Sequence, residues 1–313
     1  MRAALRVTSF VALAALLSGC SGDADSVDAT AEAPPEEDGA PAEAGRSGIT
    51  LEGFENPESA LHDPVADLYL VSNLAGDPTA KDGDGFVSRV SPDGEVVELR
   101  WIDGASDEVS LDAPKGMGLL GDTLLVADID VVRLFDRGTG APIDGWEVEG
   151  AHFLNDVAVA DDGTIYVSDS GPGFGGEDAD PGAPAIHAFS PDGSRRTLDT
   201  GDATGINGLA AVDSRLYGVT SGSGRVFLIE GGVLGDLPEL PGLGLDGIVV
   251  VDEGLLVSDW DTEAVYLLRD NGSVSAVVRN VPSPADIGID RTRERLLIPG
   301  LQTGQLLLAP LGD

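Results

Sequence analysis

Four oxygen-bearing side chains stand at the same place in a segment that recurs along the chain. They are Glu58, Asn155, Asn207 and Asp246, and each begins or closely precedes a mainly apolar run. Lys115 and Ala285 take that place in two further copies. A polar group at the start of a buried strand costs free energy unless it is solvated or has a partner. We therefore expect these side chains to share a partner.

Oxygen donors of this kind suit a hard divalent cation. Two carboxylates and two amides offer oxygen alone, and Ca²⁺ accepts irregular oxygen geometry better than Mg²⁺ does. Neither Cys nor His occupies any of the six positions, which argues against zinc. The alternative is that each residue is a polar cap or turn residue, since Asn-Gly and Asp-Gly are common in turns. Four such residues at one register favour the metal interpretation, with Ca²⁺ or another divalent cation held by Glu58, Asn155, Asn207 and Asp246.

The recurring segment also predicts the fold. Each copy has a short apolar strand, a turn that is often Asp-Gly, and a second apolar strand. The six second strands are predicted at Tyr69–Asn73, Leu124–Asp128, Ile165–Asp169, Leu216–Thr220, Leu255–Asp259 and Leu296–Gly300. Their last residues are 39 to 55 positions apart, and propeller blades repeat at about 40 to 50 residues. We predict an all-β, six-bladed β-propeller with four-stranded blades, whose innermost strands face an axial channel.

The two ends of the repeat region suggest how the ring closes. The last copy reaches the end of the sequence after three strands, and Ile49–Glu52 reads as a spare strand before the first copy. We expect this N-terminal strand to complete the last blade. A β-sandwich or a pair of small β domains is the rival architecture. Six regular copies favour the propeller.

Composition excludes several classes of function. The 313 residues include 18 Lys and Arg against 55 Asp and Glu, a net charge of −37. A nucleic-acid partner is not expected, because phosphate binding needs a basic surface. The only cysteine, Cys20, rules out a disulfide framework. We expect a monomer that acts on a small molecule.

The N-terminal segment reads as a lipoprotein signal. Arg2 and Arg6 precede a short apolar run over 7–17, which is shorter than the roughly 20 residues that span a bilayer. Leu17-Ser18-Gly19-Cys20 resembles a bacterial lipobox, so residues 1–19 are predicted to be a signal peptide and Cys20 to be acylated. The alternative is an ordinary signal peptide with a chance cysteine. Residues 20–48 are acidic, rich in Pro and without aromatics, which predicts a disordered tether to a folded domain over 49–313. The predicted location is the bacterial cell envelope, periplasmic or surface-exposed, with the lipid as the only contact with the membrane.

The repeat with its four oxygen ligands resembles the regucalcin, gluconolactonase and luciferin-regenerating-enzyme family of six-bladed calcium propellers. The resemblance covers about 49–311 and rests on Pro57-Glu58-Ser59, Leu154-Asn155-Asp156, Ile206-Asn207-Gly208 and Leu245-Asp246-Gly247. It implies that Glu58, Asn155, Asn207 and Asp246 surround one divalent cation. It also implies metal-dependent hydrolysis of a lactone or similar ester, with Asp246 as ligand, base or nucleophile.

Two positions depart from that family. Its sugar-lactone hydrolases carry an arginine two residues before the third-blade asparagine, where this chain has Phe153. Loss of a guanidinium makes a hydroxyl-rich sugar less suitable and an apolar substrate more so. Lys115 joins the ring, where its ammonium could repel the metal, clasp an anionic substrate or form a salt bridge with Glu58 or Asp156. The salt bridge is the interpretation favoured by the acid excess.

A binding module is the alternative to an enzyme. A propeller can bind a peptide, glycan or partner through its rim and keep calcium only for structure. The glycine-rich segment 171–176 is expected to overhang the channel as a lid or rim. Trp101, Trp146 and Trp260 are expected to serve packing.

Overall fold

The computed structural model describes residues 48–171 and 184–311, and the described part is built from β-strands. The predicted signal peptide, Cys20, most of the tether and most of the predicted lid segment lie outside the described residues. No helix in the described ranges has the length and apolarity to cross a membrane.

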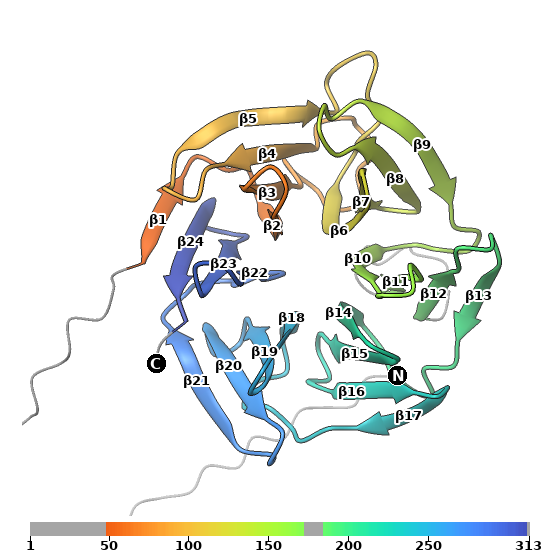
Figure 1. Ribbon diagram of the computed structural model, residues 1–313, viewed down its shortest axis with the longest axis vertical. Helices are drawn as coiled ribbons and strands as arrows, with labels where there is room; N and C mark the ends of the chain where they lie inside the picture. Colours follow the sequence, from red (N-terminus) through yellow and green to blue (C-terminus); the bar gives the residue numbers. More distant parts are fainter. Residues whose placement is uncertain (1–47, 172–183, 312–313) are drawn as a thin grey trace, which may run out of the picture. The chain divides into compact units, whose positions relative to one another are not determined.

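Six antiparallel four-stranded sheets form the blades of a propeller, as predicted (Figure 1). From the channel outward, the first three blades are β2 (Pro57–Asp63), β3 (Leu68–Asn73), β4 (Phe86–Val90) and β5 (Val96–Asp103); β6 (Pro114–Leu120), β7 (Thr123–Asp128), β8 (Val131–Asp136) and β9 (Pro142–Glu147); and β10 (Leu154–Val159), β11 (Ile165–Asp169), β12 (Ala185–Phe189) and β13 (Arg195–Leu198). The next two are β14 (Ile206–Val212), β15 (Arg215–Thr220), β16 (Val226–Glu230) and β17 (Val233–Asp236); and β18 (Leu245–Val251), β19 (Gly254–Asp259), β20 (Ala264–Arg269) and β21 (Val274–Arg279). The sixth is β22 (Gly288–Asp290), β23 (Arg295–Gly300), β24 (Gln305–Pro310) and β1 (Ile49–Glu52).

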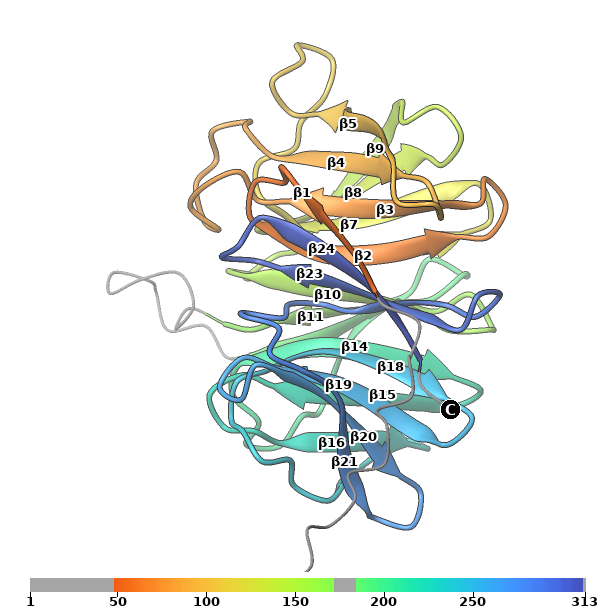
Figure 2. The same cartoon turned by 90° about the vertical axis from the view of Figure 1, so that its left-hand side faces the viewer.

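The sixth blade joins the two ends of the described chain. β1 pairs antiparallel with β24, with Leu51 opposite Leu306, and forms the outer strand of that sheet (Figure 2). Leu51 is buried in a cluster with Tyr69 of the first blade and Leu297 of the sixth. The same side chains thus fill the space between the first and last blades.

The apolar core lies between neighbouring blades. One cluster, for example, joins Leu125 and Val132 of the second blade to Val157 and Val167 of the third. The second strand of each blade is buried on both faces, whereas the outermost strands are largely exposed. This difference explains why the second strands stand out as apolar runs, and each ends at the predicted residue.

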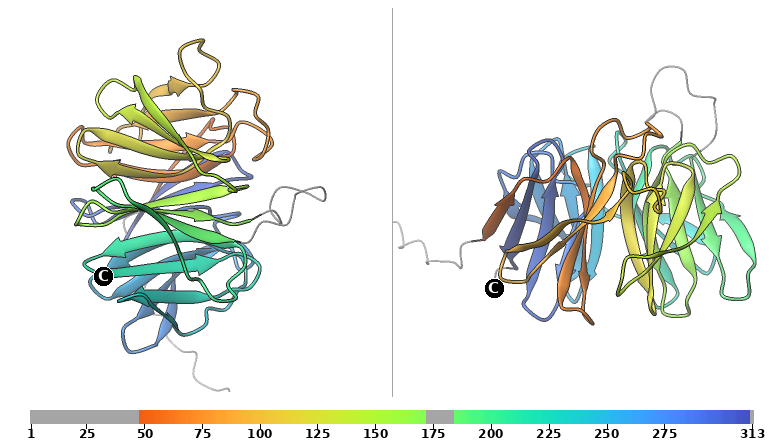
Figure 3. Two further views of the ribbon diagram at one scale, coloured as in Figure 1. Left: turned by 90° about the vertical axis from the view of Figure 1, so that its right-hand side faces the viewer. Right: turned by 90° about the horizontal axis from the view of Figure 1, so that it is seen from above.

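The starts of the inner strands share one face of the propeller with the longest described loop. Pro57 at the start of β2 pairs with Asn73 at the end of β3, and the loop 74–85 leaves from that end. Drawn in orange, this loop extends beyond one face of the molecule (Figure 3). We call this the loop face.

Candidate functional site

Five inner strands carry the same irregularity at the predicted ring. The register with the second strand shifts between 57 and 60, 114 and 117, 154 and 157, 206 and 209, and 245 and 248. In each case two residues oppose one, which is a β-bulge. The first of each pair is the predicted ring residue: Glu58, Lys115, Asn155, Asn207 and Asp246. A bulge changes the direction in which a side chain points. The local backbone geometry therefore distinguishes these five positions from the rest of each strand.

Serine side chains on the second strands complete three of the bulges. The hydroxyls of Ser72, Ser168 and Ser258 accept the N–H groups of Ser59, Asp156 and Gly247, at 2.9, 2.8 and 2.8 Å. A buried N–H without an acceptor would cost free energy. The Ser in the repeated second-strand pattern therefore holds the bulge in place.

The Asn or Asp that ends the second strand has a structural role as well. Asn73, Asp128 and Asp169 accept backbone N–H groups from the segment that enters the inner strand, at 3.1, 2.8 and 3.0 Å. These contacts fix the approach of the chain to each ring position.

The structure buries all four predicted metal ligands in equivalent places on the inner strands β2, β10, β14 and β18. Glu58, Asn155, Asn207 and Asp246 are 4 to 6% exposed, and their strands surround the channel (Figure 1). Glu58 and Asp246 lie near enough for the charge of Asp246 to affect the pKa of Glu58. The structure thus places the four predicted ligands on inner strands around one channel, and their role as ligands stays a prediction.

Two carboxylate oxygens in this group have no hydrogen-bond partner in the described part of the chain. They are Oε2 of Glu58 and Oδ1 of Asp246, and both are buried. The amide nitrogen of Asn155 donates to Ser170 Oγ at 3.0 Å, and that of Asn207 donates to the Leu245 carbonyl at 3.4 Å. Using the amide nitrogens as donors leaves the amide oxygens available as ligands.

Burial makes the carboxylates of this region weak acids. It raises the pKa of Asp246 to about 7, although a hydrogen bond from Trp260 opposes the shift. Burial and the nearby charges of Asp246 and Asp286 raise the pKa of Glu58 well above its usual range. Desolvation and charge repulsion both disfavour several anions in one buried place. A bound cation would relieve that cost.

Two further carboxylates, Asp156 and Asp286, form a second tier one residue deeper in the channel. Burial raises the pKa of Asp156 to about 6 and that of Asp286 well above its usual range. Glycines make room for them: a Cβ on Gly116 would lie 2.3 Å from Asp156 Oδ1, and one on Gly247 would lie 2.8 Å from Asp286 Oδ1. Sequence reasoning passed over this tier as a site. Its signal was the residue after each ring position, which is Ser, Gly or Asp in every copy.

Lys115 does not form the predicted salt bridge. Its ammonium donates to the carbonyl oxygens of Pro78 and Ala113, both at 3.0 Å, and lies 4.4 Å from the centre of the Phe153 ring. Within the described residues it makes no ion pair with Glu58 or Asp156, because its side chain reaches toward the loop 74–85 instead. Burial lowers the pKa of Lys115 to about 8, and the charge of Glu58 opposes the shift.

Trp260 does more than the packing expected of it. Its indole Nε1–H donates to Asp246 Oδ2 at 2.7 Å. This contact orients the Asp246 carboxylate and leaves Oδ1 as the atom without a partner.

The residues present fit a hard divalent cation. In the described chain no cluster of three or more His, Cys, Asp or Glu side chains is arranged to hold a metal. The predicted set differs from such a cluster because it combines two carboxylates with two amides. Its two buried carboxylate oxygens without partners are the observation that favours a cation at this place.

Comparisons with solved structures identify the fold. A candidate gluconolactonase superposes with a TM-score of 0.62 at 17% identity, over 86% of this chain and 95% of that one. Luciferin-regenerating enzyme gives a TM-score of 0.60 at 13% identity over 85% and 96%, and virginiamycin B lyase from Staphylococcus aureus gives 0.58 at 10% over 85% and 100%. No family model and no curated protein matches the sequence. The likeness to the first two agrees with the resemblance expected from the sequence, at the level of a shared six-bladed propeller.

Proposed function

We propose that this protein is a metal-dependent hydrolase of a lactone or ester, with a divalent cation, Ca²⁺ by preference, held by Glu58, Asn155, Asn207 and Asp246. The observation that carries the proposal is the pair of buried carboxylate oxygens, Glu58 Oε2 and Asp246 Oδ1, that have no hydrogen-bond partner in the described chain. The likeness to a candidate gluconolactonase and to luciferin-regenerating enzyme supports the choice of reaction class.

A cation bound at this place would supply Lewis-acid chemistry, polarising a carbonyl oxygen and acidifying a water. The protein's own groups provide the rest. Asp246, oriented by Trp260, is the group that accepts the proton of the attacking water.

The rim near Lys115 and Phe153 would select the substrate. The Lys115 ammonium lies against the Phe153 ring and is already bound to two carbonyl oxygens, so the aromatic ring is the main feature of this part of the site. An apolar acyl group beside a polar carbonyl suits that surface better than a sugar does.

The test is turnover of a panel of lactones and aryl esters by the full-length protein with Ca²⁺, Mn²⁺ or Zn²⁺. We expect turnover that requires the metal and falls about 100-fold or more in Asp246→Asn. The matched control is Asp270→Asn, an exposed carboxylate in the turn between β20 and β21. Activity that survives Asp246→Asn unchanged would refute the assigned role. No turnover, with calcium still raising the melting temperature, would favour a non-catalytic binding propeller.

We also propose that acylated Cys20 anchors the protein in the cell envelope. The support is the sequence Leu17-Ser18-Gly19-Cys20 after an apolar run. Cys20→Ser should move the protein from the membrane fraction to the soluble fraction and abolish labelling by a fatty-acid analogue. Unchanged labelling of Cys20→Ser would contradict the anchor.

A further inference from the structure

A cavity of about 570 Å³ opens on the channel beyond the metal-ligand ring. Its lining begins at Ser59 and at Asp156 of the second tier. It reaches Asp161 and Asp252 beyond the far ends of the inner strands. It therefore opens away from the loop face, and none of the four predicted metal ligands lines it. Sites for small organic molecules have volumes of about 300 to 1,000 Å³.

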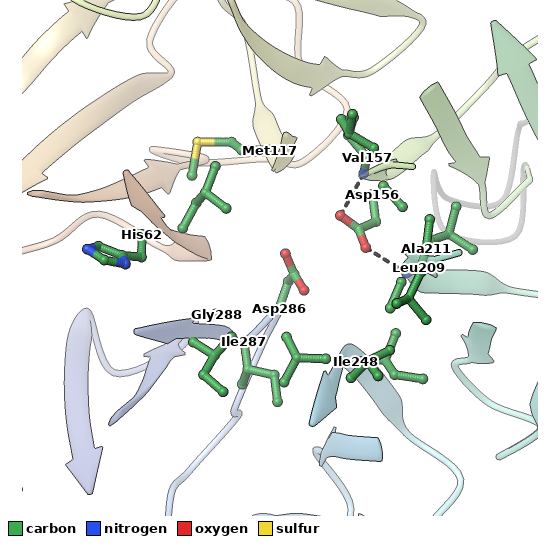
Figure 4. A pocket seen from close by; sticks show the side chains of 18 of the residues that line it. His62, Met117, Asp156, Val157, Leu209, Ala211, Ile248, Asp286, Ile287 and Gly288 are labelled. Carbon is green, nitrogen blue, oxygen red and sulfur yellow. Dashed lines mark hydrogen bonds between the residues drawn. The ribbon is translucent and has the colours of Figure 1, made fainter. Parts of the chain in front are cut away.

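The cavity has apolar walls and two carboxylates at its centre. Leu209, Ile248 and Ile287 are among the apolar side chains that surround it, and Asp156 and Asp286 direct their carboxylates into it (Figure 4). This combination matches a molecule with an apolar body and one polar end.

The two carboxylates differ in how they are bound. Asp156 accepts the backbone N–H groups of Val157 and Leu209, each at 2.6 Å, which fixes its orientation. Asp286 accepts the Ser59 hydroxyl on Oδ2 at 2.5 Å, whereas its Oδ1 accepts no hydrogen bond within the described part of the chain. The Asp286 residue is only 9% exposed. Oδ1 of Asp286 thus faces an apolar space in which no described group donates a hydrogen bond to it.

The cationic groups at the rim are engaged elsewhere. Arg291 donates to the Val250 carbonyl at 2.6 Å, and His62 lies 3.4 and 3.6 Å from carboxylate oxygens of Asp67 and Asp290. Among the described residues, neither Asp156 nor Asp286 makes an ion pair. Both carboxyl groups therefore have no cationic partner in the described protein, and a ligand could supply one.

We propose that this cavity binds a small organic cation, a primary ammonium on an apolar body. The ammonium lies between Asp286 and Asp156, and the body packs against Leu209, Ile248 and Ile287. A carboxylate that pairs with an ammonium away from water gives a charge-assisted hydrogen bond, which is stronger than a neutral one. A metal ion does not fit as well, because the walls offer hydrocarbon in place of further ligand oxygens.

The test is isothermal titration calorimetry of the full-length protein in chelator with three probes of one shape. They are 2-phenylethylammonium, neutral 2-phenylethanol and anionic 3-phenylpropanoate. We expect the ammonium to bind about 10-fold or more tightly than the alcohol, and the anion not to bind. Asp286→Asn should lower the affinity for the ammonium by about 10-fold or more, whereas Asp252→Asn, an exposed rim carboxylate, should change it less than about 2-fold.

Equal affinities for the ammonium and the alcohol would overturn the proposal, as would unchanged ammonium binding by Asp286→Asn. If Asp286→Asn does not fold, a second variant tests the proposal. Ala211→Trp fills the cavity from a partly exposed position on β14 and should abolish ammonium binding. Retained binding in Ala211→Trp would also overturn the proposal. The calcium response of the ring should persist in Ala211→Trp, so failure of this site is distinguishable from failure of the proposed hydrolase.

Discussion

The surroundings of Asp246 show what makes one carboxylate among 55 acidic residues a candidate for chemistry. Oδ2 is held by the Trp260 indole at 2.7 Å, and Oδ1 is buried without a hydrogen-bond partner in the described chain. In the ranges that the structure describes, most of the other acids lie at the surface or cap turns, as Asp136 does by accepting the N–H of Thr139. A side chain held on one oxygen and open on the other is suited to bind a ligand.

Trp260→Phe should weaken calcium binding by about 10-fold without unfolding the protein. The change keeps an aromatic ring but removes the donor that orients Asp246, and groups that orient a metal ligand contribute on this scale. Calorimetric titration with calcium measures the effect. Trp146→Phe is the control, because Trp146 stacks on Phe189 with ring centroids 5.4 Å apart and makes no contact with Asp246. Equal affinities of the two variants would show that the indole does not position Asp246.

At the scale of the element, the bulges at the start of the inner strands connect the fold to the site. Each bulge places one side chain at the ring, and the bulge of the third blade also places the next side chain, Asp156, in the second tier. Ser258 shows how it is maintained: its hydroxyl accepts the Gly247 N–H and donates to the Ala285 carbonyl of the next blade, both at 2.8 Å.

Ser258→Ala should lower the free energy of unfolding by about 1 to 3 kcal/mol. The variant leaves a buried N–H and a buried carbonyl without these partners, and an unsatisfied buried group costs about that much. Urea unfolding followed by circular dichroism measures the change. Ser194→Ala, at an exposed turn, should change it by less than about 0.5 kcal/mol. A loss no larger in Ser258→Ala than in this control would mean that the bulge does not depend on the hydroxyl.

At the scale of the whole molecule, closing the ring gathers negative charge on the axis. Glu58, Asp156, Asp246 and Asp286 come from four blades, and each has a raised pKa, first because of burial. Lys115, the cation whose charge acts on Glu58, is bound to two carbonyl oxygens. The fold therefore favours either protonation of these carboxyl groups or the binding of a cation on the axis.

In chelator, the melting temperature should fall as the pH rises from 5 to 8. The pKa of Asp246 is about 7 in the folded protein against an ordinary 3.8, so between these values the folded state holds a proton that the unfolded state has lost. Stability from this group is full below about pH 3.8 and is lost as the pH rises through about 7, by up to about 1.4 kcal/mol per pH unit. Scanning calorimetry should show a shallower fall for Asp246→Asn and for the wild type in saturating calcium. Identical slopes for the variant and the wild type would contradict the raised pKa.

The sequence determined the elements of this protein, because short apolar strands at a regular spacing leave a clear one-dimensional pattern. The six second strands and the ring positions of Glu58 and Asp246 follow from that pattern. Apart from β1, the outermost strands do not: β13 (Arg195–Leu198) is exposed and polar, and only pairing with β12 makes it a strand.

The partners of the side chains at these sites were decided by the tertiary structure alone. Lys115 turns to the Pro78 carbonyl, Trp260 reaches Asp246, and Asp286 receives the Ser59 hydroxyl from the first blade, 227 residues earlier in the chain. A side chain's partner depends on which strand the ring places beside it and on the rotamer that the space allows. Neither property can be derived from the spacing of residues along one strand. The periodic pattern therefore located the ring positions, and the closed ring gave the residues there their partners.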